Sequence, residues 1–179
     1  MSTQFVNSHL HSLPVPCNIV DGAVYIEEQA ANGIRQWSQH FDQMVFAMPQ
    51  VPDQHMSPVF RWVPFEGLGL GERVKIQPLP WGYGPAAHLK HCREVASLFR
   101  RLIPEYRYLQ FGIGGCTFGD WSALGARLAK RMRRSYAVHT DWVTHCMTIP
   151  SDIRGLRRMK RLVERKVMFY AERRVIRSA

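Results

Sequence analysis

The chain has 179 residues, of which 46% are apolar and 21% are charged, which excludes a disordered protein and suffices for one domain with its own core. Its formal net charge of +10 favours an anionic partner, which is nucleic acid, an acidic membrane surface or a phosphorylated substrate. Ten Lys/Arg and three Asp/Glu lie between Ser151 and Ala179, so this segment carries +7 of the total. A nucleic-acid-binding protein more often spreads its cations over a whole face, so we do not expect nucleic acid as the partner.

The cysteines and the first residues indicate a cytosolic protein. Cys17, Cys92, Cys116 and Cys146 are far apart and include no Cys-x-x-Cys pair, so we expect reduced thiols rather than a zinc or redox site. The first five residues lack the basic start and apolar run of a signal peptide. No stretch reaches the roughly 18 apolar residues of a membrane span.

The first predicted elements are a short strand over Gln4–Ser8 and a loop over His9–Cys17, whose two prolines cannot serve a central strand. His9 and His11 have no carboxylate or third histidine near them in the sequence, which favours surface histidines over metal ligands. We therefore expect neither a metal nor another cofactor.

A helix and a buried strand come next. Asp21-Gly22 predicts the turn into the helix, with Asp21 as its N-cap. Apolar residues recur at helical spacing at Ala30, Ile34, Trp37 and Phe41. The apolar run Met44–Met48 predicts an inner strand, which completes a right-handed β-α-β unit.

Strands and helices continue to alternate in the middle of the chain. The pattern predicts strands over Val59–Pro64, Val74–Leu79 and Tyr108–Ile113, and helices over Ala86–Leu102, closed by Pro104, and Asp120–Met132. Gly67–Gly71 lacks the Lys-Ser/Thr ending of a P-loop and the last glycine spacing of a dinucleotide fingerprint, so it favours a turn between strands. The aromatic and glycine loop Pro80–Pro85 either stacks against a sugar or base or packs the surface.

This alternation predicts an α/β fold, a Rossmann-like, mainly parallel sheet with helices on both faces. Ligands of such sheets collect at the carboxyl ends of the strands. The apolar run that begins at Tyr136 ends there in His139, Thr140 and Asp141, and Gly114-Gly115 lets the backbone approach a ligand closely. Four turns are expected to meet at this edge: Asp21-Gly22, Trp81–Gly84, Gly114-Gly115-Cys116 and His139-Thr-Asp141.

One long helix is predicted from about Ser151 onward. Its narrow apolar stripe consists of Leu156, Met159, Val163, Val167 and Tyr170, and its other side carries Arg157, Arg158, Arg161 and Arg165. This pattern is either an ordinary solvated face or a contact with an anionic membrane surface.

The order of these features resembles the N-terminal half of a two-domain glycosyltransferase of GT-B architecture, in the large retaining group called family 4. The resemblance covers nearly the whole chain and rests on five segments: Asp21-Gly-Ala-Val-Tyr25, Trp37-Ser-Gln-His-Phe-Asp-Gln-Met-Val45, Leu124-Gly-Ala-Arg-Leu-Ala129, Tyr136-Ala-Val-His-Thr-Asp141, and Arg161-Leu-Val-Glu-Arg-Lys166 with its continuation to Ala179.

The resemblance implies an acceptor-side domain, inactive alone, whose nucleotide-sugar donor binds to a second domain with a Glu-x7-Glu motif that this sequence lacks. The implied acceptor is a glycan or a lipid-linked sugar. His139 matches a family histidine that ends a strand near the transferred sugar, and Asp141 is a second catalytic candidate. The Gly-Gly turn that follows the family's first strand appears here only as Asp21-Gly22, reached after a longer loop.

Overall fold

The structure is a computed structural model that describes residues 7–113, 118–140, 149, 152–177 and 179, without the side chains of 168, 171 and 172. Its centre is a parallel sheet of five strands in the order β6-β4-β1-β7-β8. These strands are β1 (Ser8–Ser12), β4 (Gln43–Pro49), β6 (Val74–Leu79), β7 (Tyr108–Gly112) and β8 (Ala137–His139). The predicted α/β, Rossmann-like fold is therefore confirmed.

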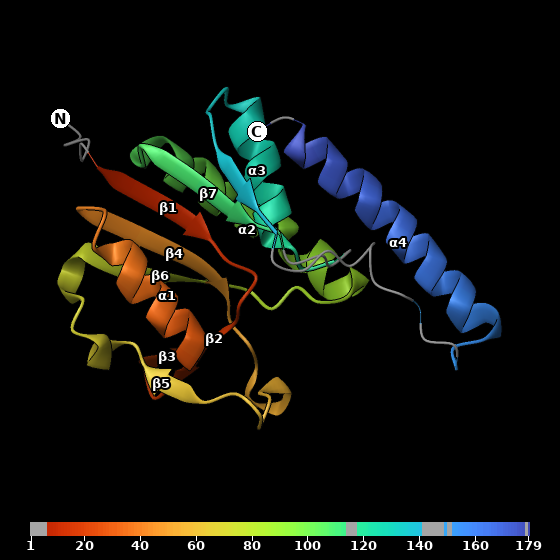
Figure 1. The fold of residues 1–179 in the computed structure, drawn as a ribbon, viewed down its shortest axis with the longest axis horizontal. Coiled ribbons are helices and arrows are strands. Elements are labelled where there is room, and N and C mark those ends of the chain that lie inside the picture. Colours follow the sequence, from red (N-terminus) through yellow and green to blue (C-terminus); the bar gives the residue numbers. More distant parts are fainter. Residues whose placement is uncertain (1–6, 114–117, 141–148, 150–151, 178) are drawn as a thin grey trace.

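Helices lie on both faces of this sheet (Figure 1). They are α1 (Glu28–Ser38), α2 (Pro85–Glu105), α3 (Trp121–Arg131) and α4 (Gly155–Ile176). Strand β4 shows why two layers are needed, because its apolar residues alternate between the faces. Met44, Phe46 and Met48 pack with Ile34 of α1, whereas Val45 and Ala47 pack in the cluster that contains α2 and α3.

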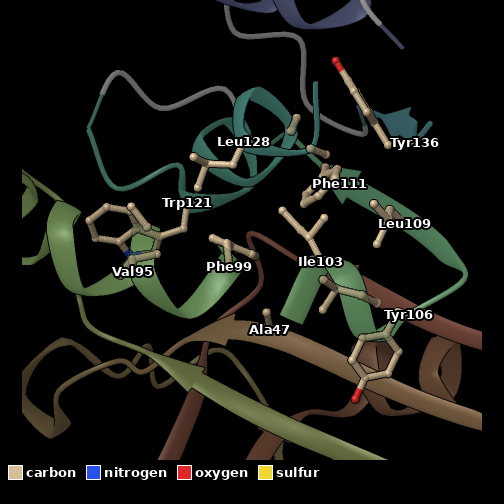
Figure 2. Packing of buried hydrophobic residues seen from close by; sticks show 14 of the residues in the cluster. Ala47, Val95, Phe99, Ile103, Tyr106, Leu109, Phe111, Trp121, Leu128 and Tyr136 are labelled. Atoms are coloured by element: carbon tan, nitrogen blue, oxygen red, sulfur yellow. The ribbon is translucent and has the colours of Figure 1, made fainter. Parts of the chain in front are cut away.

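The larger core lies between the sheet and the pair α2 and α3. Figure 2 shows Phe99 of α2, Phe111 of β7 and Trp121 of α3 among the side chains that fill it. Phe99 and Phe111 are fully buried and meet edge to face, with ring centroids 6.1 Å apart. Asp120 caps α3 as predicted, because its carboxylate accepts a hydrogen bond from the Ala123 amide at 3.1 Å.

The first 30 residues differ from the prediction. Strand β1 begins at Ser8, so His9 and His11 lie in the central strand of the sheet and not in a surface loop. A second, antiparallel sheet has the order β2-β3-β5, formed by β2 (Cys17–Val20), β3 (Ala23–Glu27) and β5 (Trp62–Pro64). Its strand β5 occupies the end of the segment Val59–Pro64, which was predicted as a strand. That strand therefore belongs to the antiparallel sheet and not to the parallel one.

The predicted helix start at Asp21 was wrong. Asp21 and Gly22 form the hairpin turn between β2 and β3, with φ of 50° and 81°. Positive φ at both central residues matches the twist of a two-residue hairpin, and Asp-Gly adopts it readily. Helix α1 begins at Glu28, and the Glu27 carboxylate caps it by accepting from the Ala30 amide at 3.0 Å.

Two smaller details also bear on the prediction. Gly69 and Gly71 adopt positive φ in turns between β5 and β6, as expected for a connection between strands. Helix α2 does not end before Pro104, because it continues to Glu105 and includes the proline in its last turn.

The order of the strands defines a switch point in the parallel sheet. After β1, the chain adds β4 and β6 on one side of it and then β7 and β8 on the other side. The position between β1 and β7 is therefore the switch point, where ligands of open α/β sheets bind.

Candidate functional site at the carboxyl ends of the strands

The candidate site lies where β1, β7 and β8 end. The sheet ladder continues past β7, because the Ile113 amide donates to the His139 carbonyl at 2.9 Å. On the other side of β1, the Leu13 amide donates to the Ala47 carbonyl at 2.9 Å. These bonds fix the backbone on both sides of the switch point, so side chains there are held by the sheet rather than by free loops.

His139, the last residue of β8, lies over Gly112 of β7. A Cβ added to Gly112 would lie 2.8 Å from Cε1 and 3.2 Å from Nε2 of His139, and 3.1 Å from Cδ of Pro14. Gly112 therefore leaves the space that the imidazole occupies. The absence of a side chain at this position is what brings the β8 histidine against the end of β1.

Gln110 orients the same imidazole. Its Nε2 lies 3.2 Å from Nδ1 of His139. When the amide nitrogen donates to Nδ1, the proton of an uncharged His139 ring is on Nε2. The ring then carries a hydrogen-bond donor at its Nε2 end, which suits the recognition of a hydroxyl oxygen.

Two buried histidines stand behind His139. The rings of His11 and His139 meet edge to face with centroids 5.2 Å apart, and His9 lies 5.4 Å from His11. His9 and His11 are only 2% and 3% exposed, and within the described part of the chain neither ring nitrogen of His11 has a hydrogen-bond partner. Buried polar groups without partners are uncommon and mark positions with a special requirement.

Burial sets the ionisation of both rings. It lowers the pKa of His9 to about 4. Burial, together with charge on His9 and on His139, lowers the pKa of His11 to about 2. Both imidazoles are therefore neutral at pH 7.

An open cavity of about 640 Å³ lies beside His9, on the face of the sheet that carries α1. Trp37 and Phe41 form one wall, where Phe41 stacks on His9 with centroids 4.5 Å apart. Tyr108 and Gln110 of β7 form the other wall. The lining also includes Asn7, Arg107 and Ser135, which precede β1, β7 and β8, so the cavity lies toward the amino ends of these strands. Gln110 links it to His139, because the same side chain lines the cavity and contacts the imidazole.

The aromatic loop after β6 meets the same edge. The Tyr83 hydroxyl donates to the Pro14 carbonyl at 3.4 Å, and Tyr83 lies 4.3 Å from the Trp81 ring. Gly82 lies so close to the buried Trp121 that a Cβ would come within 2.2 Å of Cζ2. The loop is therefore packed onto α3, and Pro14 lies between it and His139, which leaves stacking on a sugar or base a prediction.

Of the other predicted site residues, one pair lies in a different sheet and three lie outside the described part of the chain. The Asp21-Gly22 turn belongs to the antiparallel sheet, so the expectation that it lies at the carboxyl edge of the parallel sheet was wrong. Asp141, Gly114 and Gly115 lie outside the described residues.

The predicted basic residues are on α4. Arg157, Arg158 and Arg161 are exposed and Arg165 is half-buried. Arg161 lies 3.6 Å from the Glu164 carboxylate.

Sequence reasoning missed four members of the site, which are His9, His11, Gln110 and Gly112. His9 and His11 alternate with Leu10 in the pattern of a strand, but their polarity and the prolines that follow favoured a loop. Gln110 and Gly112 were included in the predicted strand Tyr108–Ile113 without a role. In the described residues, no group of three or more His, Cys, Asp or Glu is close enough to hold a metal ion, and no helix there is long and apolar enough to cross a membrane.

Comparisons with known proteins give no relative for this chain. No protein-family model, no curated protein and no solved structure matches it at a significant level.

Proposed function

We propose that this chain is the acceptor-side domain of a glycosyltransferase, which transfers a sugar from a nucleotide-sugar to a glycan or lipid-linked acceptor. The observation that carries the proposal is the place of His139. It ends a strand beside the switch point of a Rossmann-like sheet and rests on a glycine that leaves room for its ring. The resemblance of the sequence to family-4 enzymes of GT-B architecture supports the same assignment.

The chemistry requires orientation and charge more than a covalent step by the protein. Glycosyl transfer passes through an oxocarbenium-like transition state, so groups near the anomeric carbon act by fixing hydroxyls and offsetting charge. His139, with Gln110 donating to Nδ1, offers Nε2–H to a hydroxyl of the donor sugar. In the proposal Asp141, two residues further on, accepts the proton of the acceptor hydroxyl or fixes its position.

The proposal gives the neutral pair His9 and His11 a positioning role. His11 packs edge-on against His139, and Phe41 and Trp37 hold His9 from the other side. The donor nucleotide-sugar is bound by a separate domain in this scheme, so the chain alone is expected to bind acceptor without transferring sugar.

Acceptor binding can be tested on the chain as it is. Titration with glycans and lipid-linked sugar analogues should shift the backbone amide resonances of Gly112, Ile113 and His139 in ¹⁵N-correlated NMR spectra. Asp141→Asn should weaken this binding about fivefold, because in the proposal its carboxylate binds the acceptor hydroxyl and a lost hydrogen bond is worth about 1 kcal/mol. Asp42→Asn, at an exposed aspartate just before β4, is the matched control and should bind like the wild type. Shifts elsewhere, or equal binding by both variants, would argue against the assignment.

One observation favours a second candidate function, a non-catalytic module that holds an anionic membrane surface. The apolar stripe of α4 is exposed, with Leu156 at 84%, Met159 at 62% and Val163 at 60%. The same helix carries the exposed Arg157 and Arg158. An amphipathic helix with basic residues on its polar face is suited to lie in the headgroup region.

Vesicle sedimentation distinguishes this second function. The chain should bind phosphatidylglycerol–phosphatidylcholine vesicles more strongly than pure phosphatidylcholine vesicles. Arg157→Glu/Arg161→Glu should reduce binding at least about tenfold, since each cation near such a surface contributes about 1 kcal/mol. The control Arg35→Glu/Arg100→Glu changes the net charge equally at exposed positions of α1 and α2. Equal losses from both pairs would show a general charge effect and remove the α4 surface from consideration.

A further inference from the structure

The cavity of about 640 Å³ beside His9 has no role in the proposed transfer. It lies toward the amino ends of β1, β7 and β8, whereas His139 lies at the carboxyl end of β8. Its volume is in the range of sites that bind small molecules. Because its lining includes the rings of His9, Trp37, Phe41 and Tyr108, we call it the aromatic cavity.

These rings contact one another and form a continuous surface. Phe41 lies at its centre, with its ring centroid 4.5 Å from that of His9 and 6.1 Å from that of Trp37. The Tyr108 ring meets Phe41 edge to face at 5.8 Å, and the Arg107 guanidinium lies 5.2 Å from the Tyr108 centroid. The rings are therefore held by their neighbours before a ligand binds, which lowers the entropic cost of binding.

Two of the rings are exposed although they are large and apolar. Trp37 is 38% exposed and Tyr108 is 44% exposed, and both line the cavity. Aromatic side chains gathered in a concave region are typical of sites that bind small molecules. A ligand that covers these rings removes apolar surface from water, and an aromatic ligand adds contacts between rings.

The lining also contains a buried polar group that no described residue satisfies. His9 is 2% exposed, and its Nδ1 has no hydrogen-bond partner within the described part of the chain. Burial lowers the pKa of His9 to about 4, so the imidazole is uncharged at pH 7. A neutral imidazole has one donor and one acceptor, so a hydroxyl or N–H group of a ligand can hydrogen-bond with it.

We propose that the aromatic cavity binds a small, uncharged, planar aromatic compound that carries a hydroxyl or N–H group. The rings of the ligand pack against Trp37 and Tyr108, in the offset or edge-to-face arrangements that aromatic pairs prefer. Its polar group hydrogen-bonds with the imidazole of His9, which supplies the partner that a buried polar group usually has. The proposal does not depend on glycosyl transfer, because neither a sugar nor the carboxyl edge of the sheet takes part.

The polar groups around the cavity favour this ligand over a sugar. A sugar ring carries several hydroxyls, each of which needs a hydrogen-bond partner when it leaves water. Nδ2 of Asn7 already donates to the His40 carbonyl at 2.6 Å, and Nε2 of Gln110 already contacts His139 at 3.2 Å. An aromatic compound with one polar group requires only the contact with His9.

Isothermal titration of the whole chain with 2-naphthol at pH 7 tests the proposal. Decahydro-2-naphthol has the same hydroxyl on saturated rings and should bind about tenfold more weakly, because it makes no ring-to-ring contacts. 2-Methoxynaphthalene has the aromatic rings without the donor and should bind about fivefold more weakly. In NMR spectra, 2-naphthol should shift the indole N–H resonance of Trp37 and the backbone amides of Tyr108 and Gln110.

Substitution of the exposed tyrosine at the cavity shows whether binding occurs there. Tyr108→Leu keeps an apolar side chain but removes the ring, and it should weaken 2-naphthol binding about fivefold. Tyr170→Leu is the matched control, because Tyr170 is 60% exposed on α4, outside the cavity, and its loss should leave the affinity unchanged. Equal affinity for 2-naphthol and either comparison compound, unchanged binding by Tyr108→Leu, or tighter binding of maltose than of 2-naphthol would overturn the proposal.

Discussion

Acidification from pH 7 to pH 4 is expected to destabilise the folded chain by about 6 kcal/mol through His9 and His11 together, about 3 kcal/mol for each. The pKa of each ring is lowered by burial, to about 4 for His9 and about 2 for His11, from an ordinary value of 6.5. The unfolded chain therefore takes up two protons below pH 6.5 that the folded chain resists. The loss of stability is negligible above pH 6.5 and grows as the pH falls, down to about pH 4 for His9 and about pH 2 for His11. The expected loss is comparable with the whole stability of many domains.

Urea unfolding at several pH values measures this effect. His11→Leu removes one of the two groups, so its free energy of unfolding should fall about 3 kcal/mol less than that of the wild type between pH 7 and pH 4. His40→Leu at an exposed position is the control and should follow the wild type. Because the comparison uses the change with pH, a packing difference caused by leucine cancels. Parallel curves for wild type and His11→Leu would contradict burial of an uncharged His11.

Gly112→Ala is expected to lower sugar transfer about 100-fold when the chain is joined to a donor-binding domain, since displacement of a catalytic group by about 1 Å can have that effect. The new Cβ would lie 2.8 Å from Cε1 of His139 and 3.1 Å from Pro14, so the imidazole must move. Overpacking of this kind also costs about 1–3 kcal/mol of stability. Kinetics with saturating acceptor, together with thermal unfolding, would separate the two effects.

Two controls make the Gly112 experiment specific. Gly33→Ala lies in α1, where an added Cβ meets nothing within 4 Å, so it should leave transfer unchanged. The double variant Gly112→Ala/His139→Ala should transfer no more slowly than His139→Ala alone, because the clash acts through the ring that is gone. Additive losses in the double variant would show that Gly112 acts independently of His139.

The parts of the fold that could be predicted are those whose signals are local. Strand β6 occupies the predicted Val74–Leu79, and Asp120 caps α3 through the Ala123 amide. The prediction for the beginning of the chain failed because two local signals competed. Asp21-Gly22 is favourable both as a helix start and as a hairpin turn, and the pairing of β2 with β3 decides for the hairpin.

The site was predictable only where the chain itself marks a strand end. His139 followed from the rule that polar residues at the carboxyl ends of parallel strands gather at one edge. Its neighbours His11, Gln110 and Gly112 come from β1 and β7, and the register between strands brings them to His139. That register depends on packing of the whole sheet, so a single sequence does not reveal it.

Transfer by the joined enzyme tests the central claim most directly. The chain is combined with a donor-binding domain of GT-B type and supplied with nucleotide-sugars and glycan or lipid-linked acceptors, and the transferred sugar is measured. We predict transfer by the wild-type chain and an about 100-fold loss in His139→Ala at unchanged thermal stability. Transfer by His139→Ala at the wild-type rate, or no transfer from any nucleotide-sugar, would contradict the account.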